Sequence, residues 1–386
     1  MKAGAACSTV YNSGEAGKKA AEKAVEVSGE PVLTFLFTTE YHDHKAVLDS
    51  VKRVVGRSKI VGFCSAGIIA SGKVHRQAVG VCTLSGDEIR ANTTLHAGLS
   101  GNSFLAGARV ADEILSGGFD SGSVFIFPDG LTANVPELLR GLYRRMGPAF
   151  KYVGCCAGDN LKYSRTYQFT EKGIEEDAVA VVVLDGIEIE SALGHGCNPA
   201  GEPLIITRAK GKRVFEINGR SALDFYCEMM GSIPPGRFAD YAMRYPLGFP
   251  DIAGNYLIRD PVAANPDGSI DFITEIPDKS VGSIMSQVPE DMISAAWEAA
   301  DNSVRNMAHP EWMLLFDCIS RYLLMGADYE KELQVINARD GREPPFLGVL
   351  TFGNIGGFTE VPQFHRQTAQ IIAAGRMDGE NGGFAE

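Results

Sequence analysis

Two short turns combine glycine, cysteine and other small residues at the ends of apolar segments. They read GFCSAG at residues 62–67 and GCCAG at residues 154–158. Small side chains expose backbone N–H groups, which suits binding of a carboxylate or carbonyl group, and a cysteine there becomes a nucleophile where a base lowers its pKa. The structural alternative is a tightly packed strand end with buried, unreactive thiols. The candidate ligand-binding residues are Gly62, Cys64, Ser65, Gly67, Gly154, Cys156 and Gly158.

A third turn of the same kind lies near the end of the chain. The run TFGNIGG at residues 351–357 again joins glycine to exposed backbone, and it adds Gly353 and Asn354 to the candidates. Asp159 directly follows the second turn. Its carboxylate either accepts hydrogen bonds from a ligand or caps the next segment.

Charged and imidazole side chains supply one further candidate. Arg321 follows the apolar run WMLLFDC, where it either binds a ligand carboxylate bidentately or pairs with Glu330 or Glu332. His42 and His44 alternate after an apolar run and would point the same way on extended backbone. No third metal ligand lies nearby in the sequence, so a solvated loop is the better interpretation and we expect no metal site.

The sequence lacks the common catalytic signatures. It contains no G-x-S-x-G, H-E-x-x-H, Walker or kinase motif, no G-x-G-x-x-G at the turns, and no zinc-type cysteine spacing. We therefore assign no catalytic residue and expect no cofactor.

Composition limits the class of protein. The 386 residues carry a net charge of -12, which argues against nucleic-acid binding and against binding to anionic membranes. No apolar run reaches the ~18 residues of a membrane span, and the N-terminus has no signal-peptide core. The eight cysteines are then expected to be thiols in a cytoplasmic protein.

The first half of the chain contains an internal repeat. Residues 32–98 and 124–196 each give an apolar run, a polar loop, a segment with apolar residues three or four apart, and then V-G-x-C. Two apolar runs joined by a tight turn follow in each. Each unit therefore predicts a β-α-β element followed by an antiparallel hairpin. Amphipathic helices are expected at 14–27 and 102–116, and a ligand cleft at the seam between the units.

The second half has a different pattern, and Pro and Gly are frequent at residues 231–268. Strands are expected near 256–260, 270–275, 312–320 and 346–353, helices at 289–306 and 328–338, and a strand or helix at 366–374. The predicted fold class is α/β (α+β), with mixed sheets built from the duplicated unit and followed by a second α/β module. We expect domains at 1–225 and 226–375, and a mobile tail at 376–386.

Several of these runs resemble the FIST sensory family. The turn VGFCSAG at 61–67 resembles its V-G-[CS]-[ST]-T-A-G turn, and residues 193–226 resemble the end of its N-terminal module. The runs that resemble its C-terminal module, in order, are YPLGF, Arg259, GSIDFITEIP, the C-x-x-R of Cys318 to Arg321, FLGVLTFGNIGGF and FHRQT. The resemblance makes 1–225 the N-terminal module and 226–375 the C-terminal module.

The resemblance implies a sensory protein that binds a small molecule, such as an amino acid or another small carboxylate. We expect a stand-alone sensor with its ligand in a cleft between the duplicated units and the C-terminal module, and with output through a signalling protein partner. Asn354 stands where the family usually has an acidic residue, and Ser65 replaces one of two usual threonines. Ligand preference is therefore expected to differ.

Two other functions remain open at this point. A cysteine-dependent amidase or acyl transferase needs Cys64 or Cys156 to be reachable by solvent and close to a histidine or an acid. A scaffold needs an exposed apolar patch and no internal pocket. The sequence does not indicate an oligomeric state.

Overall fold

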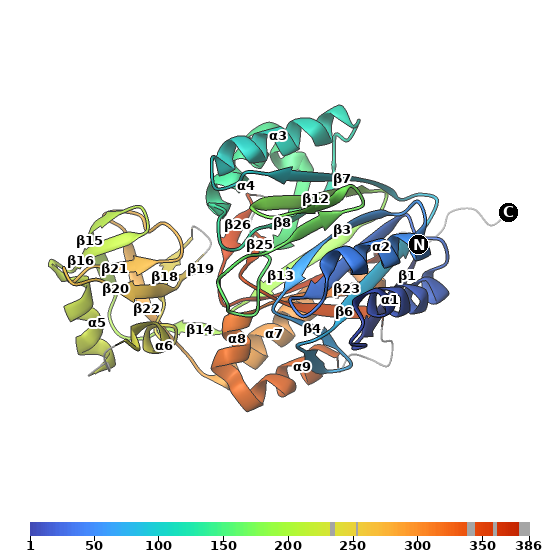
Figure 1. Ribbon diagram of the computed structural model, residues 1–386. Helices are drawn as coiled ribbons and strands as arrows, with labels where there is room; N and C mark the ends of the chain where they lie inside the picture. The colour runs from blue at the N-terminus through green and yellow to red at the C-terminus, as the bar shows by residue number, and fades with distance from the viewer. Residues whose placement is uncertain (232–235, 252–253, 338–343, 358–360, 378–386) are drawn as a thin grey trace.

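The computed structural model describes residues 1–231, 236–251, 254–337, 344–357 and 361–377 (Figure 1). A body of three six-stranded mixed sheets is built from residues 1–194 and 289–377, and a small β domain is built from residues 197–287. Figure 1 shows the small domain beside the body, and helices on three outer sides of the body. The predicted α/β (α+β) class is confirmed. In these described ranges no helix is both long enough and apolar enough to cross a membrane.

One arrangement of strands and helices occurs three times in the body. The first repeat consists of β1 (Lys2–Ser8), α1 (Ser13–Ser28), β2 (Leu33–Thr39), α2 (His44–Val55), β3 (Lys59–Ser65), β4 (Gly67–Ala70), β5 (Lys73–His75) and β6 (Val79–Ser85). In this repeat β2 and β3 run parallel, while β6 pairs antiparallel with both β2 and β1. The two long helices pack against each other on the outer face.

The second repeat has the same order and the same strand directions. It consists of β7 (Arg90–Ala97), α3 (Ser103–Ser116), β8 (Gly122–Pro128), α4 (Val135–Met146), β9 (Phe150–Cys155), β10 (Gln168–Thr170), β11 (Gly173–Glu175) and β12 (Ala178–Asp185). Again β8 and β9 are parallel, and β12 pairs antiparallel with both β8 and β7. The shared topology is what the sequence repeat leads one to expect, while a duplication as its origin stays a prediction.

The third repeat was not predicted. It consists of β13 (Ile189–Gly194), α7 (Pro289–Val304), β23 (Met307–Cys318), α8 (Ile319–Met325), α9 (Tyr329–Asn337), β24 (Phe346–Thr351), β25 (Asn354–Gly356), β26 (Gln363–His365) and β27 (Ala369–Met377). Here β23 and β24 are parallel, and β27 pairs antiparallel with both β23 and β13. The small domain is inserted into this repeat between β13 and α7. Because of this insertion, the third repeat does not follow at the same spacing in the sequence as the first two.

The three repeats exchange their short hairpins. Strands β10–β11 of the second repeat extend the sheet of the first at β3. Strands β25–β26 of the third extend the second at β9, and β4–β5 of the first extend the third at β24. Each sheet is thus completed by a hairpin from a neighbouring repeat.

Aromatic side chains fill the centre of the body, between the three sheets. Phe35 lies 5.1 Å from Phe125 and 5.5 Å from Trp312 between ring centroids, and Phe127 lies 5.7 Å from Phe316. Strand β2 is buried along its whole length, as expected for a strand covered on both faces. Four outer helices begin at side-chain caps that accept a backbone N–H three residues on, namely Asn12, Asp43, Asn102 and Asn134.

The small domain is a twisted antiparallel sheet with two short helices. It consists of β14 (Cys197–Pro199), β15 (Leu204–Lys210), β16 (Arg213–Ile217), β17 (Arg220–Ser221), α5 (Ala222–Met230), α6 (Phe238–Ala242), β18 (Leu247–Pro250), β19 (Tyr256–Arg259), β20 (Pro261–Ala264), β21 (Ile270–Phe272) and β22 (Val281–Gln287). The predicted boundary at 225–226 falls within α5, so residues of both predicted modules build the body. Most of the predicted tail, 378–386, lies outside the described residues.

Candidate functional site

The three glycine-containing turns meet at one end of the body. Each turn follows the second parallel strand of its repeat, and the three are joined in a ring by backbone hydrogen bonds. The bonds run from Gly158 N to Cys64 O (3.0 Å), from Phe352 N to Cys156 O (3.0 Å) and from Ala66 N to Leu350 O (3.3 Å). The sequence therefore identified segments that lie side by side.

The glycines in these turns are needed for close packing inside the protein. A Cβ atom on Gly62 would lie 1.7 Å from the carbonyl oxygen of Leu36, and one on Gly154 would lie 2.1 Å from that of Ile126. Both distances are impossible for a real side chain, so strand β2 approaches β3, and β8 approaches β9, only because glycine is present. This requirement explains both residues without a ligand.

The cysteines of the turns are buried. Cys64 is 1% exposed and Cys156 is fully buried. Burial raises the pKa of both thiols, because the thiolate loses its hydration. A thiol of this kind is a poor nucleophile, and no observation favours the amidase or acyl transferase alternative.

Hydrogen bonds within the turns engage the other polar candidates. The Ser65 hydroxyl donates to Gly67 O at 3.0 Å. The buried amide of Asn354 donates to Phe316 O at 3.0 Å and to Thr368 O at 2.8 Å. Asn354 thus fixes the third turn against two neighbouring strands.

Arg321 lies in a fully buried ion-pair cluster. Its guanidinium contacts Asp317 (Nε to Oδ1, 3.2 Å) and forms a short bond with Glu332, which was one of the two carboxylates predicted as its partner. The remaining N–H groups donate to the carbonyl oxygens of Met292 (2.9 Å), His195 (2.9 Å) and Gln367 (3.3 Å). Burial and the Glu332 charge hold the pKa of Asp317 well above its usual value. All five guanidinium N–H groups are engaged inside the protein.

Asp159 organises the loop that follows the second turn. Its carboxylate is 3% exposed and accepts from the backbone N–H groups of Tyr163 (3.0 Å), Ser164 (2.6 Å) and Arg165 (3.1 Å). The capping alternative foreseen for this residue is therefore present. The loop lies over the third turn, since the Tyr163 ring is 5.7 Å from the ring of Phe352.

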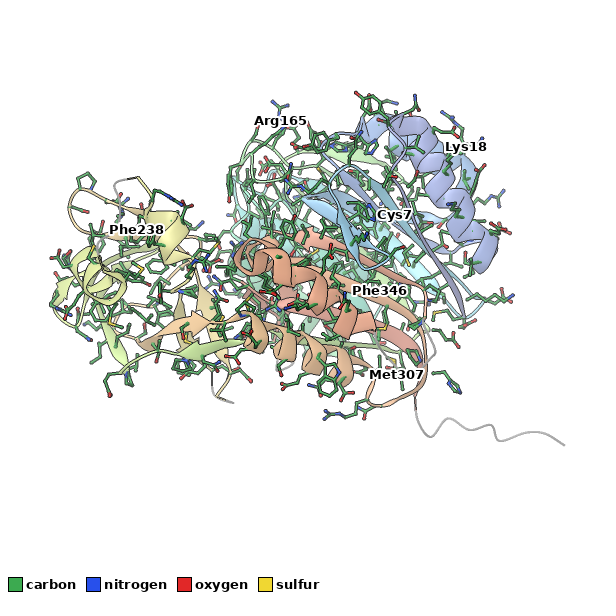
Figure 2. All side chains as sticks on the ribbon, turned by 90° about the horizontal axis from the view of Figure 1, so that it is seen from below. Cys7, Lys18, Arg165, Phe238, Met307 and Phe346 are labelled. Carbon is green, nitrogen blue, oxygen red and sulfur yellow. The ribbon has the colours of Figure 1, made fainter. Side chains whose placement is uncertain are left out.

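A charged cluster at the junction of the body and the small domain was not predicted from the sequence. Arg366 Nε bonds to Asp260 Oδ2 at 2.8 Å, and Arg366 Nη1 forms a short bond to the carbonyl oxygen of Phe352 in the third turn. Arg259 Nη1 donates to Ile258 O at 3.1 Å and to Phe364 O at 3.4 Å. Side chains occupy the space between the small domain, where Phe238 is labelled, and the body (Figure 2). Arg259 and the run FHRQT were part of the family resemblance, which was the signal that pointed to them.

The charges of this cluster do not balance. Asp260 is bonded to Arg366 and, through Oδ1, to Gln367 at 2.7 Å. Among the described residues Arg259 has no carboxylate within ion-pair distance, and its Nε and Nη2 have no hydrogen-bond acceptor. Burial accordingly lowers the pKa of Arg259 to about 10, although Asp260 opposes the shift. Burial also lowers the pKa of the neighbouring His365 to about 3, so this imidazole is neutral.

The predicted loop at His42–His44 leads into helix α2, which begins at His44. Asp43 caps the helix, and His44 Nδ1 lies 2.9 Å from the Thr38 hydroxyl. Nowhere in the described ranges do three His, Cys, Asp or Glu side chains come together as a metal site.

A cavity of about 560 Å³ lies elsewhere, at the end of the body where β8 and β9 begin. Its lining combines backbone with acidic and basic side chains, among them Glu88, Lys151, Asp185 and Glu311. None of the predicted ligand-binding residues lines it.

A model of the FIST N domain matches residues 32–220 and a model of the FIST C domain matches residues 222–357. An uncharacterized protein of Methanocaldococcus jannaschii is 26% identical over 55% of this chain, a match that spans about half (46%) of that protein. An uncharacterized protein of Mycobacterium tuberculosis is 24% identical over 96% of this chain and 99% of its own length. A crystal structure of chorismatase covers 89% of this chain and 93% of its own, with a TM-score of 0.33 and 10% identity.

Proposed function

Because the chain belongs to the FIST family, whose domains are sensory domains of signal transduction proteins, we propose that it senses a small molecule that carries a carboxylate. The ligand would bind at the junction of the body and the small domain, beside the second and third turns. Arg259 would be its principal anion-binding residue.

The observation that carries this proposal is that the guanidinium of Arg259 has no carboxylate partner among the described residues. A half-buried cation without a counter-ion is costly, and an incoming carboxylate supplies both the charge and two acceptors for Nε and Nη2. Asp260, the one carboxylate that the described residues bond within the cluster, already serves Arg366 and Gln367. The neutral His365 adds no competing positive charge.

Signal output and location complete the proposal. A ligand held by Arg259 would contact β19 of the small domain and β26 of the body. It would thereby make the junction more rigid, and a protein partner would bind to this changed junction. The eight cysteines are all free thiols, which fits the reducing cytoplasm. The net charge of -12 gives no basic surface for nucleic acid.

A thermal-shift panel of small carboxylates and amino acids tests the proposal. Ligands of the right class should raise the melting temperature of the wild-type protein and have little effect on Arg259→Gln. Arg145→Gln is the matched control, because Arg145 is 56% exposed on α4 and pairs only with the surface residue Asp112. The proposal fails if no carboxylate stabilises the wild type, or if Arg259→Gln responds as strongly as Arg145→Gln.

A further inference from the structure

The loop after the second turn has an unusual backbone conformation around Tyr163. Asn160, Leu161 and Tyr163 have φ angles of 60°, 65° and 52°, a left-handed conformation that leucine and tyrosine rarely adopt. Three backbone bonds to the buried carboxylate of Asp159 hold the loop in this shape. Strain of this kind persists where the surroundings impose it, and it is concentrated at functional sites.

The strained loop leaves its aromatic ring at the surface. The Tyr163 side chain is 67% exposed, although the ring is large enough to gain from burial. The ring is tilted by 35° against that of Phe352, and its exposure shows that much of it remains uncovered. Burial raises the pKa of its hydroxyl, and the positive charge of Arg366 opposes this shift.

Arg366 brings unused hydrogen-bond donors to the same place. Its Nε and one N–H of Nη1 are bonded, to Asp260 and to the Phe352 carbonyl oxygen. Within the described part of the chain, both N–H groups of Nη2 lack an acceptor. Phe352 links the two groups, because its ring contacts the ring of Tyr163 and its carbonyl oxygen accepts from the guanidinium of Arg366.

We propose that the ligand carries a flat unsaturated ring in addition to its carboxylate, and that Tyr163 is the residue that selects the ring. The ring stacks on the open face of Tyr163, while the carboxylate accepts hydrogen bonds from the arginines of the junction. This inference rests on the proposed carboxylate-binding function and narrows the class of ligand.

Two probes of equal charge and similar size test the selection of the ring. Benzoate is planar and aromatic, whereas cyclohexanecarboxylate has a puckered, saturated ring. Stacking contributes beyond burial of apolar area, so titration calorimetry should show benzoate binding about fivefold more tightly than cyclohexanecarboxylate. Tyr163→Phe should keep this ratio, and Tyr163→Leu should reduce it to about one while both acids still bind.

The outcomes separate this inference from the proposed function. Equal affinity of the two acids for the wild-type protein, or a ratio that Tyr163→Leu leaves unchanged, overturns the inference although Arg259-dependent carboxylate binding survives. Failure of every carboxylate to bind overturns both. Melting temperatures of Tyr163→Leu and Tyr163→Phe within about a degree of the wild type show that the exposed position tolerates the change.

Discussion

The buried amide of Asn354 supports a prediction about the stability of the protein. Replacement of Asn354 by Asp keeps the shape of the side chain but removes every N–H that it donates. The buried carbonyl oxygen of Phe316 then loses this donor, and that of Thr368 keeps the Cys318 N–H at 3.1 Å, while both face a carboxylate oxygen instead.

The magnitude follows from those contacts. A buried acceptor that loses its partner costs about 1–3 kcal/mol, and a carboxylate that faces two carbonyl oxygens adds repulsion, so Asn354→Asp should lower the free energy of unfolding by about 3 kcal/mol at pH 7.5. Burial raises the pKa of the new carboxyl in the folded protein. A raised folded-state pKa favours the folded state below the pKa of the unfolded chain, and this benefit is lost as the pH rises. The deficit should therefore be smaller at pH 4.5 than at pH 7.5.

Urea denaturation followed by tryptophan fluorescence measures this change, since Trp312 is fully buried in the core. Asn12→Asp is the matched control, because the oxygen of Asn12 is the atom that caps α1 and an aspartate caps equally well. A deficit for Asn354→Asp of less than about 1 kcal/mol, or one no larger than that of Asn12→Asp, would refute the role given to the amide.

Two further predictions concern buried titratable groups. Since burial lowers the pKa of His365 to about 3, only the unfolded chain takes up a proton at this residue between pH 6.5 and 5, which should cost about 2 kcal/mol of stability over that range. His365→Gln should remove this share of the pH dependence in thermal melts, while the shares of His44 and His195, whose pKa values burial lowers to about 4, remain. Iodoacetamide at pH 7.5, followed by mass spectrometry, should label the partly exposed Cys227 well before the buried Cys64 and Cys156; early labelling of either buried thiol would contradict their burial and revive the enzyme alternative.

The sequence predicted the individual helices and strands of the body better than the way in which they pack together. The apolar spacing locates α1 and α3 within one residue of their observed ends, because this signal is local. The convergence of the first two turns also followed from the repeated V-G-x-C run. The third repeat could not be recognised in this way, because an inserted domain separates β13 from α7 and no common sequence run survives in it.

The polar contacts of the candidate site depend on residues far apart in the chain. Asp260 and Arg366 are 106 positions apart, and no local pattern reports that the small domain brings them together. Arg321 illustrates the reverse case, since its partner Glu332 is 11 positions away and was foreseen. What the sequence could not indicate was that Arg321 would have all its donors occupied while Arg259 would not.

The exchanged hairpins have a consequence for how the chain can be divided. A fragment that ended at residue 220 would retain β9 but lack β25, and the open edge of that strand would be free to pair with other molecules. A fragment that began at residue 222 would lack β4, the neighbour of β24. The two FIST modules thus complete each other's sheets, and we expect neither half of the chain to fold on its own.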